Sequence, residues 1–314
     1  PCSPSTAGAL MHPPPFLWSC GGPVGEALME RIESAQNERF MALRRLASEP
    51  RTRRALGQCW LEGLRLVEAA LYSSNAHRAV ELVLSASVAA APSDRAARLM
   101  SEAHALSVPT LVLTDALFAK VSQVVQEQGI GLVWATAETD ATDFSRLDAT
   151  VGDGMVLDGV QDPGNVGALV RVAAAAGLGW MVSTKGTAEV WSPKALRASM
   201  GGVFGLRVLE GATAGEALAV VSGIGATPLA TVAPPAQTES LFSQGGRLSQ
   251  PAPVAWVFGQ EGSGISESLM QWPGLLRLTI PQAAAVESLN VVAAAAVCLF
   301  ERRRRLLSGQ GPVY

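Results

Sequence analysis

The chain has 314 residues, of which 48% are hydrophobic and 16% are charged, and its formal net charge is -3. This length favours about two domains, and the apolar content excludes a chain that is disordered throughout. The charge balance excludes a strongly basic protein, so only local clusters of charge can support nucleic-acid binding. The four cysteines form no CxxC pair, which argues against a metal site or a disulfide framework.

Cysteines without a disulfide pattern favour a reducing intracellular compartment, and cytoplasm, chloroplast and mitochondrion stay open. Residues 1–28 are rich in Pro, Gly and Ser, and they contain no Lys or Arg. They are expected to be a disordered leader or the remnant of a targeting peptide, and the missing basic residues favour the plain leader. The longest apolar stretch, residues 289–300, is too short to span a membrane.

The first half of the chain alternates between two kinds of apolar pattern. Helical spacing predicts four helices, at residues 32–46, 61–71, 94–106 and 117–128. Short apolar runs predict strands between them, at residues 80–83, 110–113 and 131–135. This alternation predicts a small α/β domain over residues 29–137. The polar residues 138–152 that follow are expected to be a linker.

The alternation restarts in a second region, over residues 153–314. Strands are predicted at residues 155–157, 180–183, 206–209, 229–232, 254–258 and 276–280. Helices are predicted at residues 166–176, 193–200, 213–222 and 288–307. Repeated strand–helix units of this length predict a parallel sheet covered on both faces. Ligands of such sheets bind at the carboxyl ends of the strands, which points to the turns after Leu157, Phe258 and Ile280.

The first of these turns leads into a helix that carries an arginine. Asn165 is expected to cap the helix, and Gly164 and Gly167 permit another backbone to approach closely. Arg171 follows about one and a half turns later, beside small apolar residues, so its guanidinium needs an anion or solvent. The plain alternative is a helix cap with a surface arginine.

The second turn is rich in glycine. Gly259, Glu261 and Gly264 follow an apolar strand directly, and such a loop can wrap closely around a ligand. Its spacing fits neither the dinucleotide fingerprint nor the P-loop. Glu261 is suited to bind a ribose hydroxyl or to hold an arginine, and the alternative is a solvated carboxylate on an ordinary turn.

The third turn begins at Ile280 and Pro281 and opens the final helix. Ser288 is expected to cap that helix, whose free N–H groups then favour an anion. The alternative is an ordinary connection between a strand and a helix.

In this order and at strand ends, the three turns resemble the three motifs of the SpoU/TrmH branch of the SPOUT RNA methyltransferases. The matching residues are Asn165, Gly167 and Arg171; Gly259, Glu261 and Gly264; and Ile280, Pro281, Ser288, Leu289, Asn290 and Val291. The likeness covers about residues 153–307, and residues 34–71 more weakly resemble the N-terminal RNA-binding domain of the family. The chain departs from the family pattern at Gln282, Ala284 and Val292, which puts the cofactor loop and the dimer contact in question.

The resemblance implies a parallel-sheet SPOUT domain with a trefoil knot, S-adenosylmethionine as cofactor and a homodimer formed through the C-terminal helix. Its partner-facing residues would be Leu289, Val292, Ala296 and Leu299. The cofactor would be held by Thr231, Val232, Phe258, Gly259, Gly264, Ile280, Pro281, Ser288 and Leu289.

The activity that the resemblance implies is methylation of a ribose 2′-hydroxyl, with ribosomal RNA favoured as substrate. Arg171 would be the central catalytic residue, assisted by Asn165, Glu261, Ser288 and Asn290. Because arginine is a very weak base, we expect Arg171 to position a phosphate and the hydroxyl. A transfer RNA methyltransferase of the same fold and a non-catalytic RNA-binding relative are the alternatives.

A basic stretch in the first domain supports RNA binding. Residues 31–54 contain seven arginines and three glutamates. The residues expected to contact RNA are Arg39, Arg44, Arg45, Arg51, Arg53, Arg54, Lys194 and Arg197. The alternative for this stretch is a solvated helix face, and the later run of residues 302–305 is attributed to the dipole of the last helix.

Overall fold

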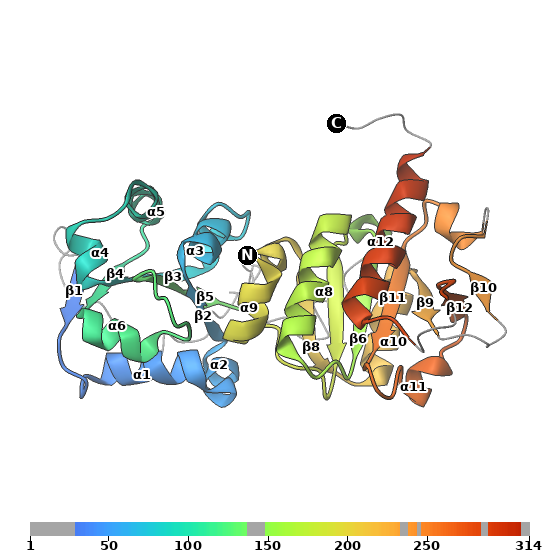
Figure 1. The fold of residues 1–314 in the computed structure, drawn as a ribbon, viewed down its shortest axis with the longest axis horizontal. Helices are drawn as coiled ribbons and strands as arrows, with labels where there is room; N and C mark the ends of the chain where they lie inside the picture. Colours follow the sequence, from blue (N-terminus) through green and yellow to red (C-terminus); the bar gives the residue numbers. More distant parts are fainter. Residues whose placement is uncertain (1–28, 137–147, 233–237, 244–245, 284–287, 309–314) are drawn as a thin grey trace, which may run out of the picture.

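The computed structural model describes residues 29–136, 148–232, 238–243, 246–283 and 288–308. Two sheets with their helices lie side by side along the longest axis of the molecule (Figure 1). We call residues 29–136 the N-terminal unit and residues 148–308 the C-terminal unit. The expected leader and most of the expected linker lie outside the described residues.

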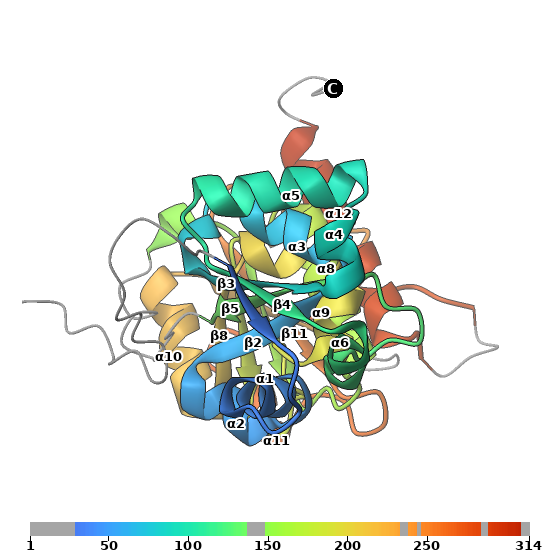
Figure 2. The ribbon, with the colours of Figure 1, turned by 90° about the vertical axis from the view of Figure 1, so that its left-hand side faces the viewer.

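The N-terminal unit contains a five-stranded sheet in the order β1-β4-β3-β5-β2. Its strands are β1 (Met29–Ile32), β2 (Gln58–Glu62), β3 (Ala79–Ser85), β4 (Thr110–Leu113) and β5 (Ile130–Ala135). Strand β5 runs antiparallel to its neighbours β2 and β3, whereas β1, β4 and β3 are parallel. The helices are α1 (Glu38–Ser48), α2 (Pro50–Leu56), α3 (Leu64–Leu71), α4 (Ala86–Ala90), α5 (Asp94–Ala105) and α6 (Asp115–Val121). Figure 2 shows α5 above this sheet and α1 below it.

Three helix predictions for this unit had wrong boundaries. Helix α1 begins only at Glu38, because the Asn37 side chain accepts hydrogen bonds from the backbone of Arg39 and Phe40. Residues 29–32 and 58–62 form strands that the helical spacing concealed, so α3 starts later than expected. Helix α6 ends at Val121, several residues before the expected end.

The C-terminal unit has the parallel sheet that the sequence predicted, with seven strands in the order β10-β12-β9-β11-β6-β7-β8. The strands are β6 (Gly154–Asp158), β7 (Trp180–Thr184), β8 (Arg207–Ala212), β9 (Thr227–Thr231), β10 (Glu239–Ser240), β11 (Val254–Gly259) and β12 (Leu276–Thr279). The helices are α8 (Pro163–Ala176), α9 (Pro193–Ser199), α10 (Ala214–Ile224), α11 (Glu267–Met270) and α12 (Val291–Leu307).

Apolar residues cover both faces of this sheet. Helices α8, α9 and α12 pack on one face and α10 and α11 on the other, in two separate clusters of buried side chains. Helices α8 and α12 lie side by side, as Figure 1 shows. The prediction of an α/β fold with a parallel sheet is confirmed, and the trefoil knot stays a prediction. No helix within the described ranges is long and apolar enough to cross a membrane.

The two units pack against each other and share one apolar core. We call the interface between them the seam. The rings of Trp134 in β5 and Phe204 in the C-terminal unit lie 5.0 Å apart, and the Asn75 side chain donates to the Phe204 carbonyl at 3.1 Å. Gly201 has a φ of +90°, and a Cβ there would lie only 2.5 Å from the Cβ of Ala69. The seam therefore brings backbones closer than any other residue at position 201 permits.

Candidate active site

The three turns singled out in the sequence lie at one edge of the C-terminal sheet. Strands β6 and β11 are direct neighbours, with Asp158 beside Gly259 in register, and β12 pairs with β9 on the other side of β11. All of these strands are parallel, so their carboxyl ends meet at the same edge. The turns that follow them are thus brought together although about 100 residues separate the first from the second.

Glu261 connects the three turns. Its Oε1 atom accepts a hydrogen bond from Asn165 Nδ2 at 2.7 Å and another from Asn290 Nδ2 at 2.8 Å. No hydrogen bond to Glu261 Oε2 is formed by any residue that the structure describes. The side chain is exposed, so this oxygen remains open to a ligand.

Both helix caps at the site differ from the sequence prediction. Helix α8 starts at Pro163 and is capped by Asp162, whose Oδ1 accepts from the Asn165 backbone at 2.9 Å. The cap assigned to Asn165 was therefore wrong, because the helix begins two residues earlier, and the Asn165 side chain is left to reach Glu261. Helix α12 is capped by Asn290 and not by Ser288, since Asn290 Oδ1 accepts from the backbone of Val292 and Ala293.

The glycine-rich loop is closed on itself. Gln260 and Gly264 exchange two backbone hydrogen bonds, of 3.0 and 2.9 Å. A Cβ at Gly259 would lie 2.3 Å from the Gly264 backbone, so this close approach requires glycine. The loop presents Glu261 at its tip with a fixed backbone behind it.

Asp158, at the end of β6, holds the residues that follow the same loop. It was not identified from the sequence. Its buried carboxylate accepts from the Ser266 backbone at 2.6 Å and from the Thr184 hydroxyl at 2.8 Å. It thus joins β6, β7 and the residues that follow the loop. The only sequence signal was an acidic residue at the end of an apolar strand.

Lys194 lies beside the cap of α8. Its Nζ atom donates to Asp162 Oδ2 at 2.7 Å. Hydrogen bonds from Lys194 and from the Asn165 backbone hold the pKa of Asp162 below its usual value, so the cap stays ionised. Lys194 is more than half exposed and can still turn toward a phosphate.

The residues expected to hold the cofactor lie at the ends of three adjacent strands. Thr231 ends β9, Phe258 and Gly259 end β11, and Ile280 and Pro281 directly follow β12. The Val232 backbone N–H donates to the Leu278 carbonyl at 2.9 Å. Ser288 and Leu289 are exposed just before α12, and Ala284 lies outside the described residues.

Two buried polar atoms lie next to the turn at Ile280 and Pro281. Thr279 Oγ1 and Gln282 Oε1 are buried, and neither has a hydrogen-bond partner among the residues described. They flank Ile280 and Pro281 on both sides in the sequence. Buried polar atoms in native proteins are normally paired, so an unpaired couple at a strand end suits a bound polar ligand.

Arg171 stands on α8 six residues after Asn165, and its side chain is exposed. No ion pair or hydrogen bond joins it to any described residue. Side chains on a helix tilt toward its N-terminus, which directs Arg171 toward the site. A Cβ at Gly202 would lie 3.2 Å from the Arg171 Cα, so Arg171 is also close to the seam between the units.

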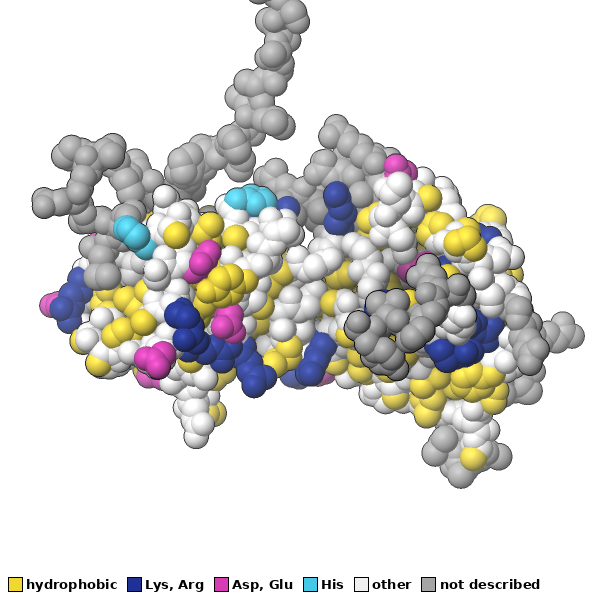
Figure 3. Space-filling view, turned by 90° about the horizontal axis from the view of Figure 1, so that it is seen from above, with side chains coloured by type: hydrophobic (Ala, Val, Ile, Leu, Met, Phe, Trp, Pro, Cys, Tyr) yellow, Lys and Arg dark blue, Asp and Glu magenta, His cyan; other side chains and the backbone are white. Residues whose placement is uncertain are grey.

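The predicted RNA contacts fall into two groups. Arg44, Arg45, Arg51 and Arg54 are exposed on α1 and α2. Arg197 is half-buried, and its Nη1 atom has no hydrogen-bond partner in the part of the chain that the structure describes. Helices α1 and α2 lie at the bottom of the N-terminal unit in Figure 1, so they are on the side away from the viewer in Figure 3, which shows further Lys and Arg side chains on the opposite face.

Two arginines do not fit their predicted role. Arg53 is buried and bonded to Glu189, so it cannot reach a phosphate. The Arg39 guanidinium is already occupied by the carboxylates of Glu30 and Glu81. Charge density along the sequence did not reveal these internal partners.

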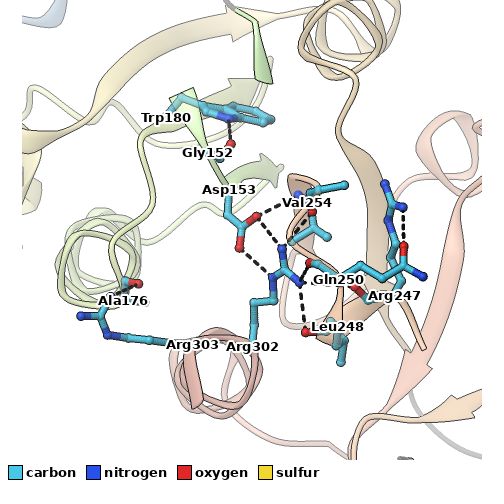
Figure 4. A network of polar contacts seen from close by, with 11 residues as sticks. Gly152, Asp153, Ala176, Trp180, Arg247, Leu248, Gln250, Val254, Arg302 and Arg303 are labelled. Atoms are coloured by element: carbon cyan, nitrogen blue, oxygen red, sulfur yellow. Dashed lines mark hydrogen bonds and ion pairs between the residues drawn. The ribbon is translucent and has the colours of Figure 1, made fainter. Parts of the chain in front are cut away.

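The arginine run of α12 also differs from its predicted role. Arg302 is buried, and it binds Asp153 at the start of β6 with a distance of 2.9 Å from its Nε atom (Figure 4). Its other nitrogens donate to four carbonyls of the segment before β11, those of Arg247, Leu248, Gln250 and Ala252. Arg303 donates to the Ala176 carbonyl at the end of α8. The run anchors α12, whose N-cap is Asn290, and does more than complement a helix dipole.

Comparison with known proteins assigns the family. An uncharacterised tRNA/rRNA methyltransferase from Synechocystis is 30% identical over 286 residues, which cover 90% of this chain and 96% of that protein. The chain belongs to the SpoU rRNA methylase family. Residues 154–300 match the sequence model of this family, and they include all three turns.

Two further proteins are similar to this chain over most of its length. The 23S rRNA (guanosine(2553)-2′-O)-methyltransferase of Bacillus subtilis is 28% identical, over 88% of this chain and 100% of its own. The AdoMet-bound rRNA methyltransferase of Sinorhizobium meliloti has the same fold, with a TM-score of 0.73 and 24% identity over 90% of this chain and 100% of its own.

Proposed function

We propose that this SpoU protein transfers a methyl group from S-adenosylmethionine to a ribose 2′-hydroxyl of ribosomal RNA. The observation that carries the proposal is the joining of the three family motifs through Glu261. The name of the Bacillus subtilis relative states the same reaction on 23S rRNA, and that relative is matched over its full length.

The strand ends around Ile280 and Pro281 suit the cofactor. Backbone groups of Thr231, Val232, Phe258 and Gly259 line the neighbouring strand ends, and Ser288 and Leu289 follow on the far side of the turn. The orphaned atoms of Thr279 and Gln282 supply a hydroxyl and an amide oxygen for its polar groups. When bound, S-adenosylmethionine supplies a methyl group on a positively charged sulfur.

A ribose hydroxyl attacks only if its proton has a place to go and its developing charge is stabilised. Every histidine of the chain precedes residue 153, so none belongs to the C-terminal unit. Glu261 Oε2 is open and can accept a hydrogen bond from the hydroxyl, while Asn165 and Asn290 keep the carboxylate in place. Arg171 holds the adjacent phosphate, for which its planar guanidinium is well suited.

The exposed arginines of α1 and α2 provide the remaining grip on RNA. Arg44, Arg45, Arg51 and Arg54 lie on one unit, and Lys194 and Arg197 on the other. Contacts to phosphates are electrostatic and independent of sequence, so this surface supplies affinity and leaves the choice of nucleotide to the site.

We also propose a homodimer through α12. Ala293, Val297 and Phe300 are exposed at positions i, i+4 and i+7 of this helix, which places them on one face. Leu299, which the sequence assigned to the partner-facing side, is buried within the chain's own core instead. The proposed contact face is therefore rotated from the one expected.

The test is methyl transfer from radiolabelled S-adenosylmethionine to separated ribosomal and transfer RNA, followed by nucleoside analysis. Wild type, Arg171→Ala and Arg207→Ala are compared, because Arg207 is an exposed arginine at the opposite edge of the same sheet. We expect 2′-O-methylnucleosides in ribosomal RNA with wild type and Arg207→Ala, and a loss with Arg171→Ala. Label on a base, or in transfer RNA only, would contradict the proposal.

A further inference from the structure

A buried ion pair crosses the seam between the two units. Arg53 in α2 binds Glu189 of the C-terminal unit through two hydrogen bonds, from Nε at 2.9 Å and from Nη2 at 2.6 Å. The side chains of Arg53 and Glu189 are only 4% and 15% exposed. Such a two-pronged, desolvated pair fixes the orientation of both partners.

The Arg53 side chain also caps the C-terminal end of helix α1 in its own unit. Its Nη1 atom donates to the carbonyls of Leu46 and Ala47 in the last turn of α1, at 3.1 and 3.3 Å. One guanidinium therefore ties together α1, α2 and the C-terminal unit. The exposed arginines of α1 and α2 directly flank these anchor points in the sequence.

Glu189 is held from the C-terminal side as well. The next residue, Val190, donates its backbone N–H to Glu210 Oε1 in β8 at 2.6 Å. Ser192 then caps α9, and α9 packs against β2 of the N-terminal unit. Helix α9 carries Lys194, which binds Asp162, the N-cap residue of α8. The segment gripped by Arg53 thus leads within five residues to the active site.

We infer that Arg53 is a positioning residue that locks the N-terminal unit in one orientation on the methyltransferase sheet. The lock holds the exposed arginines of α1 and α2 at a fixed distance from Glu261, so the enzyme spans a fixed length between gripped phosphates and the modified ribose. What those arginines bind rests on the proposed function, whereas the lock itself does not.

The physical reason lies in the cost of an unpaired buried charge. Without Arg53, the Glu189 carboxylate would be left in the seam beside Glu210, whose burial already raises its pKa to about 7. Opening the seam is the direct way to give Glu189 water. The remaining contacts, which include the Trp134–Phe204 ring pair and the Asn75 hydrogen bond, then have to hold the units together without the ion pair.

The experiment measures the distance between the units in the full-length protein by paired spin labels, without RNA. Labels are placed at exposed positions through Ser101→Cys in α5 and Ser222→Cys in α10, in a Cys2→Ser and Cys20→Ser background. The buried Cys59 and Cys298 can stay, because burial raises the pKa of both thiols and keeps them unreactive.

Four variants are compared with wild type. Arg53→Met removes the charge, and Arg53→Lys keeps the charge but loses the two-pronged geometry. Arg53→Met with Glu189→Gln removes both charges, and Arg65→Met is the control at an exposed arginine of α3 that is outside the proposed RNA surface. We expect a narrow distance distribution for wild type and Arg65→Met. Arg53→Met should be broad. Arg53→Lys and the double variant should be intermediate, because the double variant loses the bonds of Arg53 but leaves no unpaired charge at the seam.

Methylation supplies the second readout. If the competent orientation falls to about a tenth of the population, the KM for RNA rises about tenfold while kcat at saturating RNA changes less. An equally narrow distribution in Arg53→Met and Arg53→Lys would overturn the lock. A broad distribution with unchanged KM for RNA would overturn its role in spacing the RNA. Absence of methylation by wild type would count against the proposed function and leave the distance result decisive for the lock.

Discussion

A single oxygen of Glu261 accepts hydrogen bonds from both Asn165 and Asn290, at 2.7 and 2.8 Å. Asn165 lies in the first turn of α8 and Asn290 caps α12, and these two helices pack side by side on the same face of the sheet. The carboxylate is thereby fixed by one oxygen and presents the other to the ligand. A site made in this way depends on the charge of Glu261 more than on its size.

Glu261→Gln is therefore expected to lower kcat for RNA methylation about 100-fold, because the amide loses the negative charge and the free acceptor. The measurement is kcat at saturating RNA and cofactor. Glu267→Gln, an exposed neighbour in α11, serves as control and should keep wild-type activity. Equal activity of Glu261→Gln and wild type would remove Glu261 from the chemistry.

Arg302→Met should strongly destabilise the protein. The substitution leaves the largely buried Asp153, directly before β6, without its cation and removes the donor to carbonyls of residues 247–252 (Figure 4). Breaking a buried pair from one side costs about 3–5 kcal/mol of unfolding free energy. Denaturant titration measures this loss, and Arg304→Met, whose arginine is exposed beside Glu301, should leave the midpoint near that of wild type.

Gly201→Ala should also destabilise the protein, by about 1–3 kcal/mol, because an alanine at that φ is strained. Its Cβ would also collide with Ala69 across the seam. Gly205→Ala is the matched control, since nothing lies within 4 Å of a Cβ there. If both alanine variants unfold at the same denaturant concentration, the close approach at Gly201 is not required.

The buried carboxyl group of Glu210 is expected to make the stability of the fold depend on pH. Burial raises its folded-state pKa from 4.5 to about 7, so between these values the folded protein holds a proton that the unfolded chain releases. The contribution of this group is present below about pH 4.5 and is lost as the pH rises through about 7. Glu210→Gln keeps an oxygen for the Val190 N–H and should gain thermal stability relative to wild type at pH 8 but not at pH 4.5. The exposed Glu216→Gln is the control, and a parallel pH dependence of Glu210→Gln and wild type would refute the assignment.

Much of the C-terminal unit was predictable because parallel, buried strands leave continuous apolar runs, and the ends of those runs are where such sheets bind ligands. The three turns were found in this way. The polar residues that support these turns were not found. Asp158 and Asp162 accept hydrogen bonds from the backbone of Ser266 and Asn165, and the positions of these backbone groups depend on where the helices start in the folded protein. Local pattern alone assigned the caps to Asn165 and Ser288, each near the true cap but not on it.

The N-terminal unit was less predictable for a different reason. Seven arginines within residues 31–54 suggested a uniform basic surface, yet Arg53 is internal. Its partner Glu189 is 136 residues away in the sequence, and no local pattern encodes that contact. The edge strand β1 was concealed because it is only four residues long and its apolar Ile32 also fits the helical spacing of the residues in α1.

Asn290 caps α12 and holds Glu261 with the same side chain, and α12 is anchored by Arg302 near its far end. Assembly of the site and docking of the last helix are consequently one event. On the ribosome, the two sheets can begin to form while the chain is still growing, but Glu261 gains its final support only after Arg302 has left the exit tunnel. The nascent protein is thus expected to remain catalytically silent until α12 has emerged, and an aborted product that stops before residue 290 would lack the support of Glu261 by Asn290.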